Sequence, residues 1–190
     1  MMKIDSTLMC ACFALLSVSA LGCSGDDDEG AAGEMIASSQ NASLFVYGDP
    51  YAPMMAGVAN PIGNTASATA FAFDVDGEMR IELNVLGFPA SRPFGSHLHK
   101  LPCTDMTKAG GHYQNMPLPM DGTANDPTYA NATNEAWLDF TTNAQGAGSK
   151  VLTVDWLPRA GEAQAIIIHD MVSGVGGVSG AKLACLPIAF

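Results

Sequence analysis

Hydrophobic and polar residues alternate along two neighbouring segments of this chain, and this pattern constrains the fold more than any other feature. Residues 78–85 place Met79, Ile81, Leu83 and Val85 between Glu78, Arg80, Glu82 and Asn84. A period of two predicts a β-strand with one face in the core and the other in water. Residues 68–73 alternate as well, and the intervening Asp76-Gly77 is a strong signal for a hairpin turn.

The later part of the chain is also predicted to form short β-strands. A strand is predicted around His97 and His99, and four more are predicted downstream: Glu135–Thr142, Ser149–Trp156, Ala163–His169 and Ala181–Ile188. Short strands with regular turn signals predict an all-β fold, an antiparallel sandwich or barrel. Residues 103–134 are rich in Met, Pro, Asn, Thr and Gly and are predicted to form one long loop, which in a compact domain is usually functional or disordered.

Residues 1–22 have the pattern of an export signal. Leu8–Leu21 is an apolar stretch of about 14 residues, which is signal-peptide length and too short to span a bilayer. It ends in Ser-Ala-Leu-Gly-Cys, which resembles the cleavage box of bacterial lipoproteins, so Cys23 is predicted to be lipidated. Ala20 stands where leucine is usual, and an ordinary secretory signal with a nearby cut is the alternative. Both interpretations predict export.

The segment after Cys23 is acidic, rich in Gly and Ala, and unable to bury a core. Residues 23–40 are therefore predicted to be a lipidated cysteine and flexible tether, and residues 41–190 one folded domain. Ser24, rather than Asp, resembles the pattern that allows transport to an outer membrane. We expect a protein of the periplasm or cell surface, anchored to a bacterial outer membrane by its lipid alone.

The net charge limits the kinds of binding partner, and the cysteine content bears on the disulfide that an oxidising compartment would allow. The formal net charge of −11 argues against nucleic acid and against adhesion to anionic lipid surfaces. Of five cysteines, Cys10 and Cys12 would leave with the signal and Cys23 would carry lipid, so Cys103 and Cys185 remain. In an oxidising compartment two remaining cysteines predict one disulfide, with two free buried thiols as the alternative.

All four histidines lie where a metal site could use them. His97 and His99 are spaced i, i+2, which on a strand directs both rings to one face. His169 ends an apolar β-branched run that is typical of a buried strand, and His112 lies in the long loop. A lone histidine on an apolar strand is usually a satisfied core residue, so the prediction depends on the set. Several imidazoles without a thiolate favour redox copper or zinc.

Four blocks around these histidines resemble the copper/zinc superoxide dismutase family. Gly-Ser-His-Leu-His-Lys is similar to that family's Gly-Phe-His-Val-His-Glu, and Gly-Gly-His-Tyr-Gln-Asn to its Gly-Pro-His-Phe-Asn. Ile-Ile-Ile-His-Asp is similar to its Val-Val-His-Glu, and Gly-Ala-Lys-Leu-Ala-Cys to its Gly-Ser-Arg-Leu-Ala-Cys. The order agrees over about residues 60–190. The resemblance implies a Greek-key β-barrel of about eight strands, a disulfide between Cys103 and Cys185, and these copper ligands: His97, His99, His112 and His169.

The chain departs from the family at the zinc site. In the zinc enzymes the counterpart of His112 bridges both metals, and the long loop adds two histidines and an aspartate. Here the loop has no further histidine and offers Asp121, Asp126 and Glu135, whereas closed zinc sites prefer nitrogen or sulfur ligands. We expect copper and no family-type zinc site, as in the copper-only members. A makeshift zinc site of His112 and carboxylates is the alternative.

The guiding region also departs from the family. Only residues 170–181 separate His169 from Lys182, so the charged guiding loop is shortened and the copper should be more open to solvent. Lys182 replaces the arginine that draws superoxide to the copper. Lysine keeps the positive charge but loses the planar fork of donors, so steering should survive in part and weaken as salt rises.

The function that the resemblance implies is an exported copper-dependent superoxide dismutase with superoxide anion as substrate. His112 is expected to release copper(I), take a proton and return it to the peroxide. A non-catalytic periplasmic copper-binding, storage or carrier lipoprotein on the same scaffold is the alternative, because fold alone does not give function. A surface lipoprotein with a vestigial site is a third hypothesis. A copper(I) site of soft thioethers is a fourth, formed by Met106, Met116 and Met120. The sequence leaves the oligomeric state open.

Overall fold

The computed structural model describes residues 33–51 and 59–190. The predicted signal peptide, the lipidation site Cys23 and most of the tether lie outside the described residues. No helix among the described residues has the length and hydropathy needed to cross a membrane.

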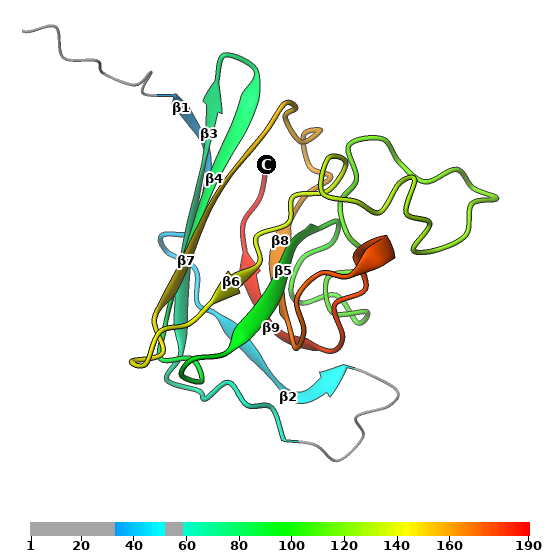
Figure 1. Ribbon diagram of the computed structural model, residues 1–190. Helices are drawn as coiled ribbons and strands as arrows, with labels where there is room; N and C mark the ends of the chain where they lie inside the picture. The colour runs from blue at the N-terminus through cyan, green and yellow to red at the C-terminus, as the bar shows by residue number, and fades with distance from the viewer. Residues whose placement is uncertain (1–32, 52–58) are drawn as a thin grey trace, which may run out of the picture. The chain divides into compact units, whose positions relative to one another are not determined.

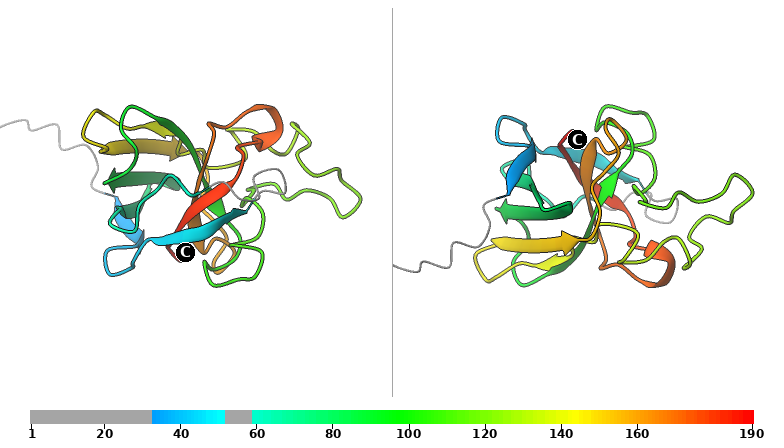
Figure 2. Two further views of the ribbon diagram at one scale, coloured as in Figure 1. Left: turned by 90° about the horizontal axis from the view of Figure 1, so that it is seen from below. Right: turned by 90° about the horizontal axis from the view of Figure 1, so that it is seen from above.

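Two antiparallel sheets face each other and make up the fold (Figures 1 and 2). The first has the order β1-β3-β4-β7, comprising β1 (Glu34–Ser38), β3 (Ser67–Val75), β4 (Glu78–Leu86) and β7 (Gly148–Val154). The second has the order β2-β9-β8-β5-β6, comprising β2 (Phe45–Tyr51), β9 (Lys182–Pro187), β8 (Ala165–His169), β5 (Pro93–His99) and β6 (Phe140–Thr141). A single 3-10 turn, η1 (Val175–Gly177), is the only helical segment among the described residues. The predicted all-β antiparallel fold is confirmed, with nine described strands in two sheets that do not close on each other.

The β3–β4 hairpin confirms the strongest sequence pattern. Val75 pairs with Glu78 on either side of the Asp76-Gly77 turn. Asp76 and Gly77 both have positive φ, as this two-residue turn requires. The alternate apolar residues of β4 are at most 1% exposed and face the second sheet across a shared core. That core also contains Ile166, Ile168 and Leu183.

Two predicted boundaries are wrong. Residues 34–38, expected in the tether, form β1 and pair with β3, where Ala37 is buried and Ile36 packs against the core. The predicted strand Glu135–Thr142 shrinks to β6, preceded by one isolated bridge between Trp137 and His97. The other predicted strands are confirmed within two residues at each end.

The long loop is pinned to the second sheet. Between residues 100 and 139 no strand forms, and the backbone there makes turns and the isolated bridges of His112 and Trp137. Cys103, at the loop's start, forms the predicted disulfide with Cys185 of β9, with 5.7 Å between the two Cα atoms. The disulfide therefore fixes the beginning of the segment that leads to His112.

Candidate metal centre

The structure brings all four predicted histidines together. His97 and His99 lie on β5, His169 ends the adjacent β8, and His112 comes from the long loop. One possible ligand atom of each ring lies within 4.8 Å of the others. This cluster is the only group of three or more potential metal-binding side chains among the described residues, and it could hold a metal ion.

Backbone pairing places His112 in the cluster. The chain after Ala109 runs antiparallel to the end of β5, where His99 and His112 form a bridge. Lys100 N donates to Gly111 O at 3.1 Å, and Tyr113 N donates to Leu98 O at 2.8 Å. The predicted loop histidine is therefore held by hydrogen bonds on both sides, although no regular strand surrounds it.

The outer nitrogens of three rings already have partners. His99 Nδ1 lies 3.0 Å from Gly110 O, His112 Nδ1 lies 2.8 Å from Glu135 Oε2, and His97 Nε2 lies 2.6 Å from Ser173 Oγ. The second nitrogen of each ring is left for the cluster. His99 Nε2 lies 3.3 Å from His169 Nε2, and His97 Nδ1 is buried without a hydrogen-bond partner. Metal-binding histidines in proteins are oriented in this way through their non-ligating nitrogen, so the residues fit a metal ion.

Burial keeps the rings in the form that binds metals. Desolvation, followed by the positive charge of His112 and His169 when protonated, lowers the pKa of His97 and of His99 well below the usual value. Desolvation also lowers the pKa of His169 to about 3. Neutral imidazole offers a lone pair, whereas imidazolium does not. These three side chains are therefore neutral ligand candidates at physiological pH.

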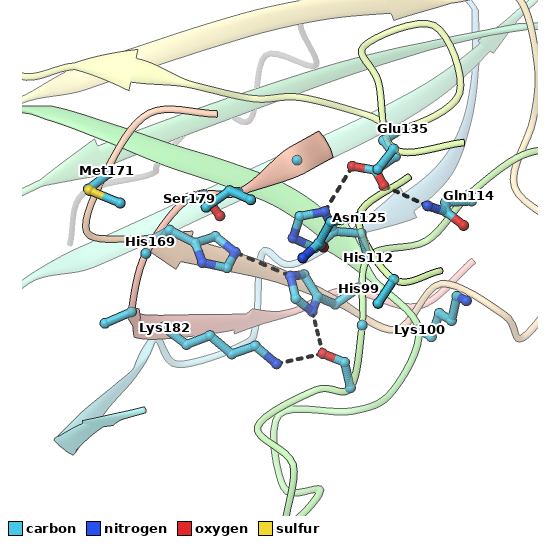
Figure 3. A pocket seen from close by; sticks show the side chains of 18 of the residues that line it. His99, Lys100, His112, Gln114, Asn125, Glu135, His169, Met171, Ser179 and Lys182 are labelled. Carbon is cyan, nitrogen blue, oxygen red and sulfur yellow. Dashed lines mark hydrogen bonds and ion pairs between the residues drawn. The ribbon is translucent and has the colours of Figure 1, made fainter. Parts of the chain in front are cut away.

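Glu135 is the buried carboxylate beside the cluster. Its side chain is 1% exposed and accepts hydrogen bonds from His112 Nδ1 and from Gln114 Nε2 at 2.9 Å (Figure 3). Trp137 Nε1 also donates to Glu135 Oε2, at 2.9 Å. Burial alone would raise the pKa of Glu135, but these donors outweigh it and the pKa is lowered. The sequence offered Glu135 as a weak zinc candidate, and the structure instead places it against the outer nitrogen of His112. Asp121 and Asp126 do not belong to the cluster.

Lys182 lines the same cavity as three of the histidines, and its ammonium group binds the loop. Nζ donates to the carbonyl oxygens of Thr107 at 3.1 Å, Lys108 at 2.8 Å and Gly110 at 2.5 Å. Gly110 O also contacts His99 Nδ1, so one carbonyl links the lysine to the cluster (Figure 3). Burial lowers the pKa of Lys182 to about 8.

A cavity of about 760 Å³ adjoins the cluster (Figure 3). Three of the four histidines line it together with Lys182, and His97 does not. Its other walls are largely apolar and include Leu118, Met171 and Val178. The loop methionines proposed as copper(I) ligands do not line the cavity, and Met106 and Met120 are almost fully exposed.

Three contributors to the site were missed at the level of sequence. Ser173 and Asp139 have no recognisable motif, and Glu135 was considered only as a metal ligand. Residues 135–139 alternate Ala136 and Leu138 with Glu135, Trp137 and Asp139, which places both carboxylates on one side of the segment but does not indicate what they contact.

Comparisons with known proteins support the fold and nothing finer. No family model and no curated protein matches the chain. Among solved structures, the chain is similar to one described as "Crystal Structure Analysis of the clock protein EA4", with a TM-score of 0.54 and 15% sequence identity. The likeness covers 83% of this chain and 94% of that one. At this identity it shows a shared fold alone.

Proposed function

We propose that this protein is an exported, copper-dependent superoxide dismutase that converts superoxide to dioxygen and hydrogen peroxide without a family-type zinc site. The cluster of four imidazoles within 4.8 Å carries the proposal. Three of these rings and Lys182 line one cavity, which joins a possible redox site to a positive charge. These are the two components that dismutation of an anion requires.

Copper is the metal that this donor set favours. Imidazole nitrogen suits copper, zinc and iron, and copper(II) has the highest affinity in the divalent series. Closed structural zinc sites, in contrast, are built mostly with cysteine. The cluster contains neither cysteine nor carboxylate.

Each residue around the site has a defined task in this proposal. Bound copper would supply a one-electron couple, through which one superoxide loses an electron and a second gains an electron and two protons. His97, His99, His112 and His169 would hold the metal as neutral rings. His112 lines the cavity and keeps its Nδ1–H on Glu135, so its Nε2 is the atom suited to take up and release a proton. Lys182 attracts the anion, an effect that falls as salt rises.

One observation favours a second function, a non-catalytic periplasmic copper-binding, storage or carrier lipoprotein. The Lys182 ammonium donates to three loop carbonyls. Its hydrogens are therefore directed at the loop, which leaves it less suited to orienting a substrate than a guanidinium would be.

The rate of superoxide consumption per bound copper separates these functions. The assay uses copper-loaded protein without zinc, with a copper–histidine complex as control. A rate near the diffusional ceiling of about 10⁸–10⁹ M⁻¹s⁻¹ supports the dismutase. A rate no better than the control, with copper retained against a modest chelator, supports storage or transfer. Loss of copper to that chelator contradicts both.

A further inference from the structure

A short chain of hydrogen bonds runs from the buried side of the cluster to a carboxylate. His97 is fully buried, and its Nε2 lies 2.6 Å from Ser173 Oγ. Ser173 Oγ donates to Asp139 Oδ1 at 2.7 Å, and Ser173 N donates to Asp139 Oδ2 at 2.7 Å. Ser96 N, next to His97 on β5, donates to Asp139 Oδ1 at 3.0 Å. Three segments of the chain therefore meet at Asp139.

The Asp139 carboxylate determines which atom donates and which accepts in each of these hydrogen bonds. Asp139 accepts from two backbone N–H groups and from the Ser173 hydroxyl, which has only one hydrogen to give. Because that hydrogen is used, Ser173 Oγ can only accept at its contact with His97. His97 Nε2 must then carry the hydrogen, and His97 Nδ1 keeps its lone pair.

We propose that Ser173 and Asp139 are positioning residues that hold His97 in its Nε2–H tautomer and so select Nδ1 as its metal-binding atom. The inference rests on the proposed metal centre. Two observations support it independently of each other: the hydrogen-bond chain at Nε2, and the burial of Nδ1 without any partner. A buried nitrogen lone pair with no donor is costly unless a metal uses it.

The opposite selection operates at two other rings. His99 and His112 each have Nδ1 in contact with an oxygen acceptor, Gly110 O and Glu135 Oε2 respectively, which leaves Nε2 for the cluster. His97 therefore binds through the other nitrogen. Without Ser173 its ring would have no fixed tautomer, and the donor set for the metal would no longer be unique. The Asp139 charge, transmitted through one hydroxyl, also makes Nδ1 a better donor.

Nitrogen NMR of the metal-free protein tests the tautomer directly. In the unaltered chain we expect His97 to carry its hydrogen on Nε2. Ser173→Ala should give a mixture of both tautomers, and Ser173→Thr, which restores a hydroxyl, should recover the single form. Ser96→Ala is the matched control: it removes a buried hydroxyl that has no partner, one residue from His97, and should change nothing.

Copper binding gives the second measurement. Ser173→Ala should weaken copper(II) affinity about 10–100-fold in a chelator competition, as loss of an outer partner of a metal ligand typically does, and should change the copper(II) EPR spectrum. Ser173→Thr should lie within about threefold of the unaltered protein.

Each result decides the proposal. An Nδ1–H form of His97 in the unaltered protein overturns it, as does a Ser173→Ala protein that matches Ser96→Ala in tautomer and affinity. Should Ser173→Ala fail to fold, the tautomer of the unaltered protein and the Ser173→Thr variant still decide. If the unaltered protein does not retain copper, the proposed function fails, while the metal-free NMR result still tests the hydrogen-bond chain.

Discussion

The two ends of the histidine cluster are held in different ways. At the cavity end, His112 has a side chain 16% exposed and contacts the Glu135 carboxylate directly. At the buried end, His97 is fully buried and reaches the Asp139 carboxylate through the Ser173 hydroxyl. The direct contact places a carboxylate charge beside the ring that lines the cavity. The indirect contact fixes a tautomer with less charge beside a ring that solvent does not reach.

Both carboxylates come from one extended segment. Glu135, Trp137 and Asp139 lie at alternate positions, and Trp137 forms a bridge with His97 between the two acidic residues. Ala136 and Leu138, at the intervening positions, are fully buried in the core. Four residues of extended chain span about 13 Å, which is enough for one segment to support both ends of a metal site. The segment that leaves the long loop therefore supplies the outer layer of the cluster.

Loss of the disulfide should have the largest effect on the stability of the protein. Within the histidine cluster, it should disturb the His112 end alone. The disulfide closes a loop with a sequence separation of 82, for which chain entropy predicts a stabilisation of about 4.5 kcal/mol. The paired change Cys103→Ala with Cys185→Ala should lower the free energy of unfolding by about that amount in urea and weaken copper binding. The His97 tautomer should not change. A change in the His97 tautomer in this variant would contradict the view that the two ends of the cluster are held independently.

Glu135→Ala should have the second-largest effect on stability. It leaves three side-chain donors without an acceptor, but only the Gln114 amide is buried, so the free energy of unfolding should fall by about 1–3 kcal/mol. Copper affinity should fall about 10–100-fold because His112 loses its outer partner. Glu135→Gln keeps the shape and one carbonyl oxygen, so it should unfold at a higher urea concentration than Glu135→Ala. Copper affinity unchanged in both variants would show that the carboxylate does not hold His112 for the metal.

Lys182 tests what the charge at the cavity end does. Lys182→Met should lower the rate per copper about 10-fold at low salt and flatten its salt dependence, because electrostatic steering is lost. A lysine is charged below its pKa and neutral above it, and burial places the pKa of Lys182 at about 8. The unaltered rate should therefore fall as pH rises through about 8. Lys182→Arg, which stays charged, should remove that fall; an identical pH profile in both proteins would exclude Lys182 as its cause.

Two glycines give the smallest and most local test. Gly177 has φ +69°, and a Cβ there would lie 3.1 Å from Glu135 Oε2 and 3.2 Å from His112 Nδ1. Gly161 has φ +76°, with nothing within 4 Å of a Cβ. Alanine at either position should cost about 1 kcal/mol of backbone strain. Only Gly177→Ala should also weaken copper binding, by a few-fold, in a chelator competition. Equal copper affinities would mean that the His112–Glu135 contact tolerates the added methyl group.

The sequence predicted the parts of this molecule that depend on local pattern. The alternation in β4 gave the hairpin and its buried face, and the i, i+2 spacing gave His97 and His99. Ser173 and Asp139 could not be predicted, because they are 34 residues apart and meet only after β5, β8 and the long loop have packed. β1 was missed for a related reason: its apolar residues are few, and pairing with β3 supplies the stability that local pattern does not indicate.

The central claim is that copper alone completes this site, because Glu135 already holds the outer nitrogen of His112. The most direct measurement is the superoxide consumption rate of the copper-loaded protein while zinc is added stepwise, with bound copper and zinc determined at each step. The account predicts a rate per copper that does not change with zinc. A rate that rises several-fold as zinc binds would contradict it, and would show that a second metal takes the place here assigned to Glu135.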